Sequence, residues 1–216
     1  MVDRRTTSRH AVIAAAVAGC ALLSACGSSS NATPNAPTPT AKPTANATPT
    51  ATPIATPRPM PDAHQLTFQT ADIPAGFAPH PGSIMTLDAK TSVSENLVSD
   101  GGVLATNGYI SGAEYGWEDK SKHLAVQNAV FVMRDANGAQ ALFDAMSNTF
   151  KPHISPNADS PHWADSTASF ASSNVSVVLF RQGTIVAAVE STPASPDQAA
   201  DLAKKLDDRY VAQFGS

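Results

Sequence analysis

The sequence predicts an α+β domain with a mainly antiparallel sheet and two amphipathic helices packed on one face of it. Three observations lead to this fold class. Strand-like and helix-like patterns follow one another over residues 62–216 in the order strands, helix, strands, helix. Short loops join neighbouring strand candidates, as in hairpins. Each helix candidate has one apolar stripe, which needs a sheet face to pack against. The other face of the sheet is then expected to be open to a ligand or partner.

The first strands are expected at 66–68, 109–117 and 124–133. A turn at 72–77 follows the first of them, and a short helix is expected at 90–98. The charged stretch 118–122 predicts a hairpin loop between the two longer strands. One parity of the second strand is rich in aromatic residues, which is typical of a strand: Tyr109, Ser111, Ala113, Tyr115 and Trp117.

The central helix is predicted from apolar residues spaced at i, i+3, i+4, i+7 and i+11: Ala139, Leu142, Phe143, Met146 and Phe150. Asn137 to Gln140 has the pattern of a capping box, and Lys151-Pro152 predicts the end of the helix.

Two further strands are expected at 175–180 and 185–189, joined by a tight turn in which Gly183 has a positive φ. A short strand at 169–171 precedes them. The last helix begins with Ser195 as N-cap and Pro196 at its first position. Its apolar face contains Ala199, Leu202, Ala203, Leu206 and Tyr210.

Proline divides the chain into parts. Of 17 prolines, nine lie within residues 31–61, a stretch of Thr, Pro, Ala and Asn without apolar periodicity. Such a composition cannot pack a core, so residues 26–61 are predicted to be a disordered tether. Residues 62–216 are long enough for a single globular domain.

The first 25 residues have the pattern of an export signal. Three arginines lie within residues 2–10, and an uncharged apolar run follows over 11–23. This run is too short to span a membrane and has the length of a signal-peptide core. An ordinary secretory signal cut near Ala25 and an uncleaved anchor are the alternatives. Arg4-Arg5 leaves open whether export uses the Sec or the twin-arginine route.

The apolar run ends in Leu23-Ser24-Ala25-Cys26, which resembles the lipobox of bacterial lipoproteins. The resemblance implies that residues 1–25 are removed and that Cys26 becomes the N-terminus, with diacylglycerol on its sulfur. Acyl chains anchor a protein because each buried methylene contributes about 0.8 kcal/mol. The expected location is the cell membrane, lipid-anchored on its extracytoplasmic side.

The remaining cysteine, Cys20, lies in the apolar run and leaves with the signal. The mature chain then has no thiol for catalysis, disulfide formation or metal binding beyond the acylated Cys26. Residues 62–216 carry a net charge of −8, which repels nucleic acid. No cofactor and no nucleic-acid partner are therefore expected.

One loop holds candidate metal ligands: His153, Asp159 and His162, near Asp165 and Trp163. Imidazoles and carboxylates suit Zn²⁺ or Cu²⁺, but this spacing matches no fixed helix or strand geometry. A solvated loop is the preferred interpretation, with Trp163 as a lid over the edge of the core.

The aromatic strand is the second candidate. Tyr109, Tyr115 and Trp117, if exposed beside Glu114 and Glu118, would form a surface for sugars or cations. Ordinary core packing is the alternative. The two glutamates are also a formal acid–base pair, which requires that they share a cleft.

The order of elements resembles that of PsbP-like envelope lipoprotein domains, a likeness of pattern without a specific motif. The sequence analysis therefore favours a non-catalytic module that binds a small molecule or an envelope protein. The alternatives are a cell-envelope enzyme, either glycan-active or a metal-dependent hydrolase, and a structural or assembly accessory with an exposed apolar patch.

Overall fold

The computed structural model describes residues 60–80, 82–157 and 161–215. Cys26, the predicted signal peptide and all but the last two residues of the predicted tether lie outside them. Asp159, one of the candidate metal ligands, also lies outside. Residues Arg58–Ser216 form a compact unit of their own.

The described residues form an eight-stranded sheet in which every strand pair is antiparallel. The order of strands is β1-β3-β4-β8-β7-β6-β5, and β2 also pairs with β3. Both predicted hairpins are present, and Gly183 has φ of 58° in the second turn. The strands are β1 (Ala78–Pro79), β2 (Met85–Thr86), β3 (Tyr109–Asp119), β4 (Leu124–Met133), β5 (Ser155–Pro156), β6 (Ser166–Ala171), β7 (Ser176–Gln182) and β8 (Ile185–Thr192).

The described helices are α1 (Ala63–Leu66), α2 (Ala89–Ser94), α3 (Gly102–Thr106), α4 (Ala136–Phe150) and α5 (Pro196–Phe214). The α+β class and both long helices are confirmed. The N-cap of α4 is Asp135, whose Oδ1 accepts from the Gly138 N–H at 2.8 Å, so the predicted cap at Asn137 is wrong. The predicted strand at 66–68 is also wrong. Asp62 caps a helical turn there by accepting from the His64 N–H.

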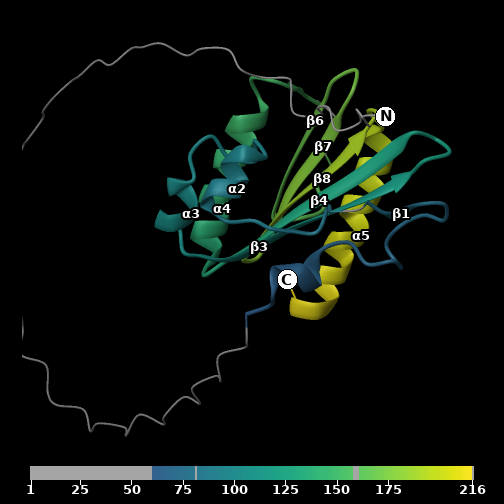
Figure 1. Cartoon of the computed structure of the whole chain (residues 1–216). Coiled ribbons are helices and arrows are strands. Elements are labelled where there is room, and N and C mark those ends of the chain that lie inside the picture. The colour runs from purple at the N-terminus through teal and green to yellow at the C-terminus, as the bar shows by residue number, and fades with distance from the viewer. Residues whose placement is uncertain (1–59, 81, 158–160, 216) are drawn as a thin grey trace, which may run out of the picture. The chain divides into compact units, whose positions relative to one another are not determined.

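The two long helices lie on opposite faces of the sheet, so their predicted placement on one face is wrong (Figure 1). On β4, alternate residues pack toward different helices: Val126, Val130 and Val132 lie in the core under α5, and Ala129, Phe131 and Met133 lie in the core under α4. Strands that are apolar on both sides need a cover on each. Among the described residues, both faces at the centre of the sheet are therefore covered, and the open face expected there is absent.

The first described residues are held against α5. Arg209 of α5 donates from Nη2 to the carbonyls of Leu66 and Thr67, both at 2.8 Å. Its Nη1 lies 2.9 Å from Asp72 Oδ2, and the Tyr210 hydroxyl donates to the Leu66 carbonyl at 2.7 Å. These contacts join two segments more than 130 residues apart. They hold residues 66–72 against α5.

Replacing Arg209 by Ala is expected to lower the free energy of unfolding by about 2–4 kcal/mol. The change leaves two carbonyls and the Asp72 carboxylate without their shared partner. Urea denaturation measures the loss, and hydrogen exchange should show reduced protection at residues 66–72. The control is Asp201→Ala, an exposed position on the same helix, which should change stability by less than about 0.5 kcal/mol. Equal losses for both variants would contradict the role given to Arg209.

Asp207 is a buried carboxyl on α5. It is 2% exposed, and its Oδ1 has no hydrogen-bond partner in the described structure. Burial raises its pKa from 3.8 to about 6. The native state therefore binds this proton more tightly than the unfolded state does. Ionisation of Asp207 destabilises the fold as pH rises from about 4 to 6, and the cost remains above that range.

Asp207→Asn is accordingly expected to raise the melting temperature at pH 7.5, with a gain that shrinks toward pH 4.5. Differential scanning fluorimetry across this pH range measures the effect. Asp208→Asn, the exposed neighbour, should show no gain that depends on pH in this way. A lower melting temperature for Asp207→Asn at every pH would mean that the charged carboxylate stabilises the fold.

Candidate functional site

The three predicted aromatic residues do not form one exposed surface. A β-bulge between Tyr109 and Ser111 shifts the register of β3 against β4. The bulge places Tyr109 on the opposite face from Tyr115 and Trp117, although all three have the same parity in the sequence. Tyr109 packs in the core under α4, where its hydroxyl donates to the Leu87 carbonyl.

Tyr115 and Trp117 belong to the core under α5, with ring centroids 5.2 Å apart. Trp117 is 5% exposed, which leaves no ring face for a ligand. The three residues therefore pack against two different cores and do not share one surface, as the predicted binding surface would require.

The two described candidate metal ligands, His153 and His162, lie next to different cores of the domain. His153 is exposed after α4, between Phe150 and Ile154, which pack in the core under α4. His162 is exposed beside Trp163, whose ring meets Phe180 edge-on at 5.3 Å in the other core. Within residues 60–80, 82–157 and 161–215, no group of three His, Cys, Asp or Glu gathers to hold a metal. The expected lid role of Trp163 fits its packing.

Glu114 and Glu118 each have their own partners. Glu114 is 5% exposed and accepts from Gln127 Nε2 at 2.5 Å. Burial raises the pKa of the Glu114 carboxyl. The hydrogen bond from Gln127 lowers this pKa, and the nearby carboxylates of Glu95 and Glu190 raise it. Glu118 lies 3.2 Å from Lys120. Four residues of a strand separate the two Cα atoms by about 13 Å. The two carboxyl groups therefore have separate partners, Gln127 for Glu114 and Lys120 for Glu118.

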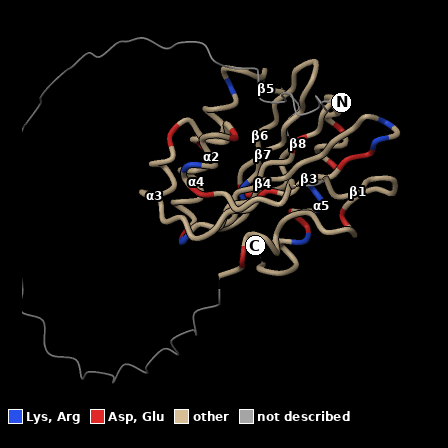
Figure 2. Tube along the Cα trace, in the orientation of Figure 1, with Lys and Arg blue, Asp and Glu red and all other residues tan. Residues whose placement is uncertain are grey.

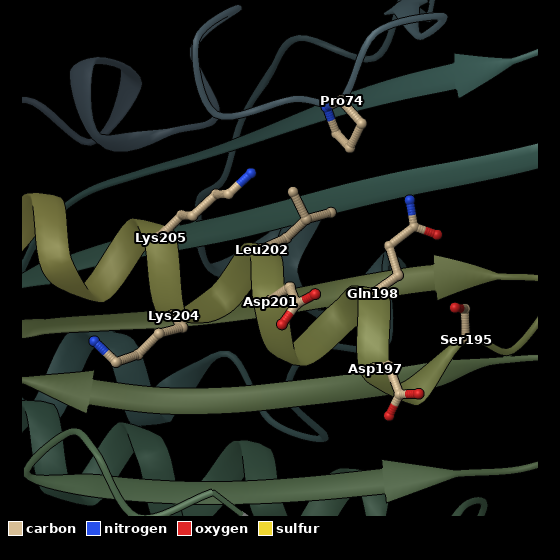
Figure 3. Close-up of a pocket in the computed structure, with 8 residues that line it drawn as sticks. All are labelled: Pro74, Ser195, Asp197, Gln198, Asp201, Leu202, Lys204 and Lys205. Atoms are coloured by element: carbon tan, nitrogen blue, oxygen red, sulfur yellow. The ribbon is translucent and has the colours of Figure 1, made fainter.

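An open groove of about 540 Å³ runs along α5 (Figure 3). One stripe of the helix, formed by Gln198, Leu202 and Lys205, points toward Pro74 on the facing loop. A second stripe carries Asp197, Asp201 and Lys204. Ser195 lies at the end of the groove, where the helix begins. The full lining is Pro74, Ser195, Asp197, Gln198, Asp201, Leu202, Lys204 and Lys205. We call this surface the α5 groove.

The facing wall of the α5 groove is a turn that Asp72 organises. Its Oδ2 accepts from the Gln69 N–H at 2.8 Å and also contacts Arg209. The Asp72 carbonyl accepts from Lys205 Nζ at 3.4 Å. Because both cations belong to α5, the turn and the helix keep a fixed spacing, and the groove between them is preformed.

Charge is ordered along the α5 groove. Asp197 and Asp201 lie near the start of the helix, and Lys204 and Lys205 lie up to two turns further on. Acidic and basic residues also lie side by side at the β3–β4 hairpin, where Lys120 and Lys122 pair with Glu118 and Asp119 (Figure 2). Leu202 belongs to the core and is 1% exposed, so Pro74 is the exposed apolar residue beside these charges. An extended segment with a cationic and an anionic group fits this arrangement.

Sequence analysis assigned Ser195 and Leu202 only to the cap and the apolar face of the last helix, and missed the groove. The polar stripe of α5 was visible in the sequence as Asp197, Asp201 and Lys204 at i, i+4 and i+7. Such a stripe normally faces solvent. Only the folded position of the turn around Asp72 makes it one side of a groove.

No helix in the described residues is long and apolar enough to cross a membrane. No family model and no curated protein matches the chain. Among solved structures, the chain is similar to the extracellular domain of PknH from Mycobacterium tuberculosis, with 14% identity and a TM-score of 0.48. The match covers 68% of this chain and 93% of that domain. A likeness at this level assigns no function.

Proposed function

We propose that this chain is a non-catalytic binding module, lipid-anchored through Cys26 on the extracytoplasmic side of the cell membrane. In this proposal the α5 groove binds a segment of an envelope protein. The ordered charges of the groove, acidic near Asp201 and basic near Lys205, are the observation that carries the proposal. The lipobox sequence and the Pro-rich segment after it support the anchor and the tether.

The contacts of Arg209 and Asp72 fit this role. They hold residues 66–72, and with them the turn that forms the wall of the α5 groove, against one helix. A preformed groove favours binding because no entropy is lost in ordering the groove when the partner binds.

Lipidation is tested by mass spectrometry of the chain from the membrane fraction of its own host. The expected N-terminal peptide begins at Cys26 and carries diacylglycerol on Sγ. Cys26→Ala should abolish this modification, whereas the control Cys20→Ala should retain it. An unmodified peptide that begins at another residue would show an ordinary secretory signal instead.

The α5 groove is tested by photo-crosslinking in intact cells, with the crosslinker in place of Gln198. The expected product is one discrete crosslinked species, in which the partner segment contains a cationic and an anionic residue. The same crosslinker at the exposed Asn137 of α4 should not give it. A synthetic peptide of that segment should then bind the unmodified chain in calorimetry.

Asp201→Lys should weaken this peptide at least tenfold because it reverses the charge at the acidic end. Asp144→Lys, an exposed position on α4, is the matched control and should leave the affinity unchanged. Crosslinking from Asn137 to the same partner, or equal effects of the two charge reversals, would overturn the assignment to the α5 groove.

A further inference from the structure

The α5 groove contains polar side chains that have no partner within the described domain. Asp197 and Asp201 are exposed, and neither carboxylate makes a hydrogen bond or ion pair with another described residue. The same holds for the side-chain amide of Gln198. The neighbouring carboxylate of Asp208, by contrast, is paired with Lys204. The two unpaired carboxylates and the amide can therefore bond to a segment that lies in the groove.

Of the two lysines in the groove lining, Lys205 is the one with donors to spare. Lys204 Nζ donates to Asp208, one turn further along α5, and lies 6.0 Å from the centre of the Trp163 ring. Lys205 Nζ makes one long hydrogen bond, of 3.4 Å, to the Asp72 carbonyl. An ammonium group has three donors. Lys205 can therefore also bind an anionic group of a partner.

The unpaired charges are evenly spaced along α5. Asp197, Asp201 and Lys205 follow one another every four residues, which is about 6 Å along the helix axis with a turn of about 40° around it. Alternate residues of an extended chain are about 6.6 Å apart and point to the same side. An extended segment that crosses the groove at a slight slant therefore meets these three side chains with every second residue.

The amide of Gln198 also favours an extended partner. The Gln198 side chain points toward Pro74, on the side of the helix that faces the opposite wall (Figure 3). An amide has both donors and an acceptor. An extended segment has backbone N–H and C=O groups without partners of its own, whereas a helical segment uses them internally. Gln198 can therefore bond to the backbone of an extended segment.

On the basis of the proposed function, we propose that the α5 groove recognises an extended segment with the pattern cation-x-cation-x-anion, in one of the two chain directions. The two cations face Asp197 and Asp201, and the anion faces Lys205. A segment with the same charges at another spacing is disfavoured, because some of its charges then face a like charge or none.

The test measures amide chemical shifts of the full chain carrying Cys26→Ser. The probes are peptides with blocked ends that contain two lysines, one glutamate and serines. Two have the charges at alternate positions, one in each chain direction, and two have them adjacent or four residues apart. All have the same net charge, so general attraction to the acidic domain is equal. One alternate peptide should bind about threefold tighter or more than the peptides of other spacing, with shifts centred on residues 197–205.

Two lysine variants test the anionic contact. Lys205→Gln should weaken the preferred peptide about threefold or more, because it removes the cation that faces the glutamate. Lys204→Gln is the matched control and should leave the affinity unchanged, since Lys204 pairs with Asp208. When serine replaces the glutamate of the peptide, Lys205→Gln should no longer weaken binding.

Several results would overturn the charge pattern. These are equal affinity at all spacings, tighter binding of the adjacent or the four-residue spacing, no saturable shift with any peptide, and equal effects of Lys205→Gln and Lys204→Gln. The proposed function is decided separately, by crosslinking of the native partner from position 198. Spacing-selective binding of a peptide without that crosslink would support the pattern and overturn the envelope-protein partner.

Discussion

The burial of the central strands on both faces is the constraint on which the rest of this structure depends. In β4, β7 and β8, successive residues enter two separate cores, one under α4 and one under α5. Neither helix alone can cover a sheet of this kind. The domain is therefore a three-layer arrangement, and surfaces for binding must lie along helices and at strand ends instead of on an open sheet.

Helix α5 consequently has two roles. Its apolar stripe, from Ala199 to Tyr210, closes one core. Another side lines the α5 groove. The same helix also holds Leu66 and Thr67 through Arg209. Core packing, the position of the first described residues and the α5 groove thus depend on the position of one helix.

Buried polar groups mark where this packing is least complete. Asp207 has a raised pKa because it lies against the core without a partner for Oδ1. Glu114 has a raised pKa for the same main reason, but Gln127 satisfies its carboxyl. The contrast shows that burial alone does not identify a site.

The sequence by itself determined the local elements. Periodicity and turn residues are short-range signals, so the two long helices, both hairpins and the turn at Gly183 were predictable. Helix placement, the face of Tyr109 and the α5 groove required the tertiary structure. The continuous apolar runs of 124–133 and 175–180 do not indicate which face of the sheet each helix covers. The extra residue at the β3 bulge moves Tyr109 to the other face of the sheet, and no sequence signal predicts this change. The α5 groove combines Pro74 with residues 195–205, which are far apart in the chain, and long-range packing alone sets the distance between them.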